Sequence, residues 1–585
     1  MAVTTLISPG VEVKEIDKTA SLGAVALGGG AFAGAFQWGP ANQIVVINSE
    51  ADLVKTFGKP DTGNTVASNK FNWLTAASFL GYTSGLQVVR TLGANSANSR
   101  IAVTGTIDGA TWFNLDDYDS NPYAGDATEQ AAFIARYPGT YGDNLGVAIV
   151  DNAKFSGWTW EKAFPSAPGS SANYTNATNN DCIHVVVYDA GGGITGVVNT
   201  ILEKFTSVSI LADAKTDFGN SNYIKDRIRD EGQWIFFGGF NIPAETGITD
   251  EAIIQGWAAD TSLTAAIDVL TTADAQWTFT GGANGDDSNL AAARGTGYDL
   301  FADPDTTDVS FFVSGSSETT SNVNAKLNTI TSARKDAFAF ISPPVGSLTS
   351  ASATLATKAT EVETWANSAT LPKSSYIVAD SGYKKMYNKY NDEYVAVPLN
   401  GDIAGISALT RINQDAWWSP AGFTRGQVRN AASLYFNPGQ EERDKLYPVG
   451  VNPVVSMPGR GTLLYGDKTT QLGTGAFTRI NVRGLFIVLE STISNFAKNL
   501  LFEFNDDFTR SQFRSLVGGY LESVQTGRGI TDYRVICDET NNTGDVVDAN
   551  EFVGDIFIKP TRSINFIRLN FIAVRTAVSF SEVGA

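Results

Sequence analysis

The sequence predicts a multidomain protein of mixed α/β and α+β class, with an α/β core, inserted mostly-β domains and a C-terminal domain of helices and strands. At 585 residues the chain is too long for one hydrophobic core, and 43% of its residues are hydrophobic, which is enough to fill several. Strand and helix patterns alternate near the N-terminus and again after residue 320, whereas the segment between is rich in strand patterns and in Asn, Ser, Thr and Gly. This arrangement indicates a core that is interrupted by an insertion.

The chain opens with a strand pattern that has no partner nearby. Val11 and Val13 alternate with Glu12 and Lys14, which is the two-residue period of a half-buried strand, and Pro9 marks its start. The residues that follow, TASLGAVALGGG, lack the tight turn of a β-hairpin. The partner of this strand must therefore lie far away, in this chain or in another one.

An α/β layer is expected next. Two buried strands, GAVALGGGAFAG and QIVVINS, precede a helix near residues 69–80 and the strand LQVVRTLG. In the helix, apolar residues recur at intervals of three and four from Trp73 to Leu80, and Gly81 ends it. Residues 19–49 carry no charge, but their many glycines and polar residues favour buried strands over a membrane span.

The middle of the chain is expected to form an insertion. Its strand patterns include RIAVTGTI, NLGVAIVD, IHVVVYDAGGGI, QWIFFGGF and DVSFFVSG, and EAIIQGWAADTSLTAAIDVL is expected to be helical. After residue 320 helix and strand alternate again, in VNAKLNTITSARK, DAFAFISPP, LATKATEVETWANSA and SSYIVAD.

The last hundred residues show the most regular pattern, with two amphipathic helices and then three strands, YRVICDE, FVGDIFIKP and the terminal INFIRLNFIAV. The apolar faces of the helices are formed by Leu485, Val488, Leu489, Ile493, Phe496 and Leu500, and by Phe513, Leu516, Val517, Tyr520, Leu521 and Val524. The predicted divisions are an N-terminal arm strand (1–20), the first part of the core (21–93), an inserted mostly-β outer domain (94–230), a second α/β insert or intermediate domain (231–320), the second part of the core (321–478), a C-terminal assembly domain (479–563) and a C-terminal arm strand (564–585).

Charge and cysteine content limit the possible partners. The formal net charge of -19 disfavours nucleic acid and anionic membranes, because no basic patch overrides the mean field. The charge is uneven, with -2 from Arg479 to the end and -17 before it, which suits a C-terminal part in protein contact and a solvated remainder. Two cysteines, Cys182 and Cys537, build no disulfide framework and indicate a reducing compartment, and the N-terminus lacks a secretion signal.

The sequence offers little catalytic equipment, so we expect no enzyme, no cofactor and no metal. The single histidine, His184, lies in the strand pattern CIHVVVY, where a structural role is more common than a catalytic one. HExxH, CxxC, GxSxG and GxxxxGK[ST] are all absent, and GGGAFAG and GGANG lack the spacing of a phosphate loop. The sequence leaves open a pair of catalytic carboxylates, since only their separation in space decides that function.

Several segments together resemble the contractile tail sheath proteins of bacteriophages, that is, of myoviruses. SPGVEVKEID resembles the N-terminal arm of that family, WGPANQIVVINSEADLVKTFG its first core segment and ARYPGTYGDNLGVAI a stretch at the edge of an inserted domain. The more specific matches follow in order: SSYIVADSGYKKMYNKYNDEYVAVPLNGDIAGISALTR, WWSPAGFTRGQVRN, MPGRGTLLYG, NVRGLFIVLE and VICDETNNT.

The resemblance implies a structural subunit that stacks in hexameric rings around the tail tube and contracts to drive the tube through the host envelope. Implied partners are further copies of the chain, the tail tube protein, and the baseplate and tail terminator proteins, without nucleic acid or membrane insertion. The implied location is the tail sheath of a virion that is assembled in the host cytoplasm. The terminal strands are implied to join the C-terminal sheets of neighbouring subunits by β-augmentation, through Val11, Val13, Phe566, Ile567, Leu569 and Phe571.

Two further questions stay open at the level of sequence. The resemblance suggests that the C-terminal domain lines the inner surface, with Arg483, Lys498, Arg510 and Arg514 as candidates to face an acidic tube, although structural ion pairs or solvated charges would look identical. The alternatives are the sheath of a phage-derived bacteriocin or secretion machine and, in a different class, a protein that binds or hydrolyses glycans through the insert. In that last case Trp112, Trp158 and Trp160 are candidates to stack on sugar rings.

Overall fold

The computed structural model describes residues 29–62, 69–104, 111–120, 130–152, 154–172, 181–209, 213–238, 275–285, 290–316 and 322–565. The expected terminal strands around Val11 and from Phe566 to Phe571 lie outside these residues, as does the helix expected at 251–270. None of the helices in the described part is long and apolar enough to cross a membrane.

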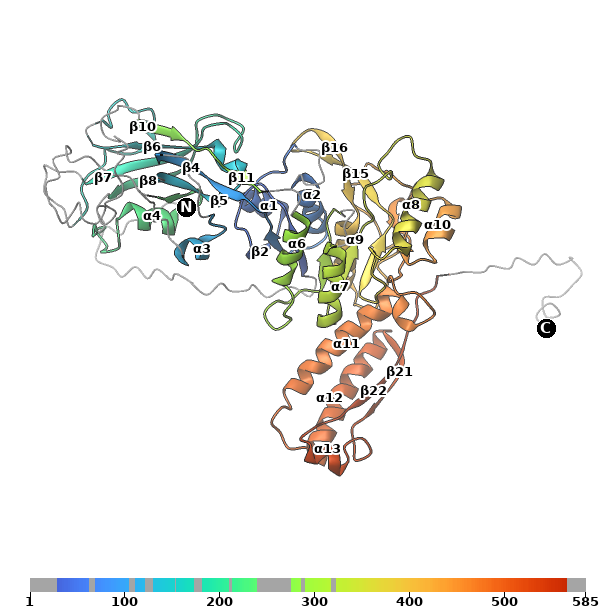
Figure 1. The fold of residues 1–585 in the computed structure, drawn as a ribbon. Coiled ribbons are helices and arrows are strands. Elements are labelled where there is room, and N and C mark those ends of the chain that lie inside the picture. The colour runs from blue at the N-terminus through green and yellow to red at the C-terminus, as the bar shows by residue number, and fades with distance from the viewer. Residues whose placement is uncertain are drawn as a thin grey trace, which may run out of the picture.

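The core is a seven-stranded sheet in the order β18-β14-β13-β12-β1-β3-β2, parallel except for β2 (Figure 1). Consecutive residues of β1 face opposite sides of this sheet: Phe32 packs in one hydrophobic cluster and Ala31 and Ala33 in another. The first cluster receives α2 and α9, and the second receives α6, α7 and α8, so helices cover both faces. The strands are β1 (Gly30–Gly34), β2 (Ile44–Ile47), β3 (Leu86–Arg90), β12 (Phe311–Val313), β13 (Phe338–Ile341), β14 (Ile377–Asp380) and β18 (Val451–Asn452), and the helices α1 (Glu50–Phe57), α2 (Asn69–Leu80), α6 (Leu290–Asp299), α7 (Asn322–Arg334), α8 (Leu355–Asn367), α9 (Asn400–Asn413) and α10 (Gln440–Leu446).

Two small sheets lie beside the core. One has the order β16-β15-β17, and the other is the hairpin β19-β20. Their strands are β15 (Tyr383–Asn388), β16 (Glu393–Pro398), β17 (Ser433–Leu434), β19 (Val454–Met457) and β20 (Gly461–Leu464). The hairpin turn falls within the family-like segment MPGRGTLLYG.

The insertion consists of two four-stranded antiparallel sheets, β10-β6-β7-β8 and β11-β4-β5-β9. A shared cluster that includes Phe133, Val147, Val185 and Ile228 joins them. The elements are β4 (Ser96–Thr104), α3 (Leu115–Ser120), β5 (Gln130–Pro138), β6 (Leu145–Val150), β7 (Cys182–Asp189), β8 (Thr200–Ser209), α4 (Ile224–Glu231), β9 (Ile235–Phe237), β10 (Ala275–Thr278) and β11 (Ala283–Asn284).

The domain boundaries differ from the predicted ones at two places. Strands β9 and β10 pair with β5 and β6, so residues on both sides of the predicted division at 230–231 share the same insertion. Strand β12 pairs with β1, and helix α6 packs on the same sheet, so the core resumes before residue 311 and not at 321. The sequence of a short apolar strand such as β12 (FFV) does not indicate which sheet it joins, because its partner strands are distant in sequence.

The C-terminal domain projects away from the core sheet, with α11 (Ile480–Lys498) and α12 (Asp507–Thr526) side by side (Figure 1). Strand β21 (Ile530–Ile536) pairs antiparallel with β22 (Asp555–Pro560), and the short helix α13 (Gly544–Asp548) lies between them in sequence. The Asp506 side chain caps α12 by accepting a hydrogen bond of 2.9 Å from the amide of Thr509.

Candidate assembly surface

The C-terminal domain has a small core of its own, built where the sequence predicts two apolar helix faces. Leu485 and Leu489 of α11 pack with Phe513, Val517 and Leu521 of α12. The cover is incomplete, because Leu516 is 46% exposed. Ile493, Phe496, Leu500 and Tyr520, which the same pattern assigns to the core, are only half-buried.

The sheet of this domain has two strands, and within the described residues each strand pairs only with the other. Cross-strand pairs Tyr533–Ile558 and Val535–Ile556 face the helices but remain half-buried. An isolated two-stranded ribbon is marginal in water and needs further strands or cover for stability. Its unpaired edges therefore form a template for added strands.

A buried carboxylate, Asp467, fixes the point where the chain leaves this domain. Asp467 is 3% exposed. Its oxygens accept hydrogen bonds from the Ser563 hydroxyl at 2.7 Å, from Nδ2 of Asn565 at 3.0 Å and from the Arg479 guanidinium at 2.8 Å. The Tyr447 hydroxyl also donates to it at 3.2 Å. Asp467 thus links the core, the start of α11 and the last described residues of the chain.

The charge of Asp467 is stabilised by these donors. Burial alone would raise the pKa of Asp467, but the hydrogen bonds from Ser563 and Asn565, together with the nearby Arg479, hold that pKa below its usual value. The carboxylate is therefore ionised at neutral pH and orders the residues that precede the C-terminal arm.

The four candidate tube-facing cations occupy different environments. Arg483 and Arg510 are 6% and 7% exposed. The Arg483 guanidinium stacks 3.9 Å from the centre of the Tyr376 ring, and Nε of Arg510 donates to Oδ1 of Asn505 at 2.8 Å. Both side chains serve packing within the chain, which argues against a tube-facing role for them.

Lys498 and Arg514 are more accessible. The Lys498 side chain is 60% exposed and lies 3.6 Å from Asp305, a distance and exposure at which an ion pair contributes little. Arg514 is half-buried. These two residues remain candidates for contact with another protein.

The single histidine has a structural environment. His184 is completely buried, its Nε2 lies 2.9 Å from the carbonyl oxygen of Ser166, and its Nδ1 accepts a bond from the amide of Ser207. Its ring stacks on Phe164 with the centroids 4.2 Å apart. Burial lowers the pKa of His184, which favours the neutral ring with the proton on Nε2.

The three tryptophans that motivated the glycan hypothesis are also buried. Trp112, Trp158 and Trp160 are 2%, 3% and 6% exposed. Trp112 packs near Tyr118 with the ring centroids 6.0 Å apart, and the other two lie on the outer face of the sheet that contains β7. Side chains in these positions fill cores and offer no stacking surface to a sugar ring.

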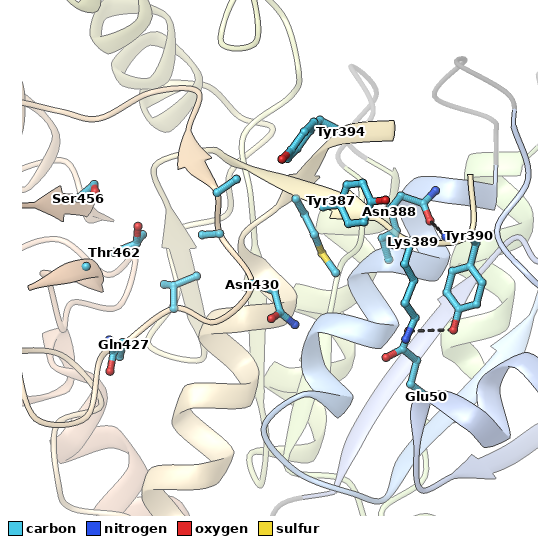
Figure 2. A pocket seen from close by; sticks show the side chains of 16 residues that line it. Glu50, Tyr387, Asn388, Lys389, Tyr390, Tyr394, Gln427, Asn430, Ser456 and Thr462 are labelled. Carbon is cyan, nitrogen blue, oxygen red and sulfur yellow. Dashed lines mark hydrogen bonds and ion pairs between the residues drawn. The ribbon is translucent and has the colours of Figure 1, made fainter. Parts of the chain in front are cut away.

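A cavity of about 800 Å³ lies beside β15 and is open to solvent (Figure 2). Figure 2 shows Tyr390 and Lys389 directed at Glu50, whose Oε1 they approach at 2.9 and 3.0 Å. Among the described residues that line the cavity, Glu50 is the only acidic one and none is histidine or cysteine. The lining therefore provides no carboxylate pair and no nucleophile with a base. Across the described residues, no group of three His, Cys, Asp or Glu side chains is placed to hold a metal ion.

Solved structures share this multidomain fold. The chain shares its fold with the sheath tail protein from Listeria innocua, with a TM-score of 0.50 at 12% identity over 91% of this chain and 95% of that one. The sheath tail protein from Desulfitobacterium hafniense has the same fold, with a TM-score of 0.50 at 12% identity over 94% of this chain and 100% of that one.

Sequence comparison identifies the family. Models of the phage tail sheath protein central domain and of the phage tail sheath C-terminal domain match residues 292–470 and 474–573, and a model of the tail sheath protein Gp18 domain III N-terminal region matches residues 31–70. The tail sheath protein of Vibrio phage KVP40 is 31% identical over 99% of this chain and 100% of its own length. That of Enterobacteria phage T4 is 31% identical over 99% of each. The chain therefore belongs to the family of phage tail sheath proteins, the structural subunits of contractile tails.

Proposed function

We propose that this sheath subunit polymerises as stacked hexameric rings around a tail tube, and that strands from neighbouring subunits complete its C-terminal sheet. The half-covered two-stranded sheet β21-β22 supports this proposal more than any other feature. The strand from Val11 to Val13 adds to one edge and the strand from Phe566 to Phe571 to another, each from a different subunit. The residues that would be an aggregation hazard in a monomer thereby become the joints of the assembly.

The energetics suit a permanent link. An added strand of about five residues forms about four main-chain hydrogen bonds at about 1 kcal/mol net each. Covering half-buried Tyr533, Val535, Ile556 and Ile558 adds about 1 kcal/mol for every 40 Å² of apolar surface removed from water. Two such strand links per subunit stay intact during contraction, while the broader and more weakly matched lateral faces of the subunits exchange their contacts.

Contraction then needs no nucleotide. The extended lattice is a metastable arrangement whose energy was stored during assembly, and each ring that converts biases the next one. In this proposal the subunit assembles in the host cytoplasm on the tube, between baseplate and tail terminator proteins. Lys498 and Arg514 are the proposed contacts to an acidic tube. The same chemistry would serve the sheath of a phage-derived bacteriocin or secretion machine.

The test uses the alternation of the N-terminal strand. Val11→Asp with Val13→Asp places charge on the face that would be buried in the neighbour, whereas Glu12→Ala with Lys14→Ala changes the opposite face. We expect the first pair to leave a folded monomer that fails to form sheath-like tubes in negative-stain microscopy, and the second pair to polymerise. Normal tubes from the first pair, or from a chain that lacks residues 1–17, would contradict the proposal.

A further inference from the structure

Two family-like segments that are distant from the arms meet in an exposed aromatic cluster. The loop of WWSPAGFTRGQVRN and the hairpin of MPGRGTLLYG are joined by a hydrogen bond of 2.9 Å from the amide of Gly422 to the carbonyl of Leu464. Phe423 and Tyr465 lie edge to face there, with ring centroids 6.2 Å apart. They are 52% and 42% exposed, which is unusual for two adjacent aromatic rings.

Arginines lie against Phe423 and against Trp418 of the same loop. The Arg460 guanidinium lies 5.2 Å from the Phe423 ring centre, and those of Arg425 and Arg528 lie 5.1 and 5.6 Å from the ring centre of the half-buried Trp418. In the described part of the chain, none of these three arginines forms an ion pair within 4.0 Å. We call the group the Arg–aromatic patch: Trp418, Phe423, Arg425, Arg460, Tyr465 and Arg528. Tryptophan, tyrosine and arginine are the residues that most often carry the binding energy of protein interfaces.

The far end of the C-terminal domain has the opposite character. Phe502, Phe504 and Phe508, at the connection between α11 and α12, are 106%, 83% and 76% exposed. This connection, residues 499–509, contacts residues 538–552 through a hydrogen bond of 2.8 Å from Asn505 to the carbonyl of Glu551. The two segments, which we call the acidic tip, contain Glu503, Asp506, Asp507, Asp538, Glu539, Asp545, Asp548 and Glu551 and no lysine or arginine.

The patch lies where core residues 418–465 meet the C-terminal end of α12, whereas the tip, which includes α13, lies at the end of the C-terminal domain that projects away from the core (Figure 1). Arg528 follows the C-terminal end of α12, where the indole of Trp417 donates to the carbonyl of Gly527 at 2.8 Å, whereas the tip begins at the N-terminal end of α12. The 20 residues of α12 separate the two by about 30 Å. One subunit therefore cannot satisfy its own patch with its own tip.

We propose that the acidic tip of one subunit docks on the Arg–aromatic patch of a second copy, head to tail along the C-terminal domains. The exposed phenylalanines pack against Phe423, Trp418 and Tyr465, and the carboxylates of the tip pair with Arg425, Arg460 and Arg528. Charge complementarity selects this occupant: the partner must be acidic and apolar at once, and the chain carries such a surface itself. A contact between two different surfaces of identical subunits propagates as an open helical array, as a sheath requires.

This inference rests on self-assembly as proposed above but not on the strand exchange. The terminal arms provide flexible links, whereas this contact sets the spacing of successive C-terminal domains. Its charged rim also makes it sensitive to salt, which the main-chain ladder of an added strand is not.

Charge reversal tests the contact. Arg425→Glu with Arg460→Glu should raise the protein concentration needed for polymerisation by about tenfold or more, because like charges then face each other. Glu503→Lys with Asp548→Lys should do the same, and the four substitutions together should restore assembly towards the level of the native chain. Lys162→Glu, on the exposed surface of the insert, is the matched control and should have no effect.

Cross-linking gives a second readout. Phe423→Cys with Phe504→Cys should cross-link between subunits in assembled tubes with a short thiol reagent, while the native Cys182 and Cys537, 1% and 0% exposed, stay unreactive. Reversed-charge variants that polymerise like the native chain, failure of the combined variant to recover, or cross-linking of the tip to the tube protein in place of the second copy would each overturn the proposal. Because the arms are intact in these variants, their outcome is independent of the Val11 and Val13 test.

Discussion

Replacing Asp467 by asparagine removes the charge from the group that joins the core, α11 and the root of the C-terminal arm. The substitution keeps the side-chain shape: one oxygen remains to accept from Arg479, Tyr447 and Asn565, and the new amide donates to the hydroxyls of Ser563 and Ser419. What is lost is the ion pair with Arg479 at 2.8 Å, and breaking a buried pair costs about 3–5 kcal/mol. The Arg479 side chain is 23% exposed, so water compensates part of that loss and we expect about 2–3 kcal/mol.

The matched control is Asp532→Asn, which breaks an ion pair of the same 2.8 Å length to Lys559 on the surface of the C-terminal domain. The Asp532 and Lys559 side chains are 61% and 74% exposed, so loss of this pair should cost far less than loss of the buried pair. Denaturant unfolding of the monomeric subunit measures both values, and hydrogen exchange across residues 561–565 reports whether the root of the arm opens.

The contribution of Asp467 to stability should also be visible in the dependence of stability on pH in the acid range. Because the pKa of Asp467 is held below its usual value in the folded state, its contribution is present above the ordinary carboxyl pKa of about 3.9 and is lost as the pH falls below it. Asp467→Asn should therefore flatten the acid limb of the stability profile. Equal losses for Asp467→Asn and Asp532→Asn, with unchanged exchange at 561–565, would refute the assigned role of Asp467.

Three further predictions concern the C-terminal domain, the core and the insert. Leu521 is fully buried, so Leu521→Ala should lower the stability of the C-terminal domain by about 2–5 kcal/mol in calorimetry. Leu516 is exposed, so Leu516→Ala should cost less than about 0.5 kcal/mol in the monomer and weaken only polymerisation. Equal losses for the two variants would contradict the assignment of Leu521 to the buried face of α12 and of Leu516 to the exposed face. Burial raises the pKa of Asp380 to about 8. The free energy of unfolding should therefore fall by up to about 1.4 kcal/mol per pH unit as the pH rises towards 8, and level off above it. If Asp380→Asn leaves the dependence of stability on pH between 6 and 9 unchanged, the titration of Asp380 is not its cause. Trp158→Ala should destabilise the insert by about 3–5 kcal/mol in thermal unfolding, and native-like stability of that variant would show that the indole is not core.

Local patterns predicted individual elements well. The helix expected at 69–80 is α2, Asn69–Leu80, because its apolar period and the glycine that ends it are local signals. The two amphipathic faces at the C-terminus are found in α11 and α12, and the structural role expected for His184 is confirmed. Trp112, Trp158 and Trp160, the candidates for sugar stacking, are buried.

Non-local relations were harder to predict. The assignment of β12 to the core sheet depends on its pairing with β1, about 280 residues away, which no local period encodes. Asp467 was missed because its partners Ser563 and Asn565 lie 96 and 98 positions further on. Arg483 and Arg510 were predicted as candidates to face the tube, and their burial was not predictable from the sequence, because charge alone does not show which aromatic ring or amide, here Phe477 or Asn505, covers a guanidinium.

The exchange of terminal strands between subunits is tested most directly by a cryo-electron microscopy map of the assembled sheath in which single strands are traced. We predict that residues around Val11 and from Phe566 to Phe571 appear as added strands on β21-β22 sheets of other subunits. A map in which both segments pair within their own subunit, or in which the edges of β21-β22 stay unpaired, would contradict the account.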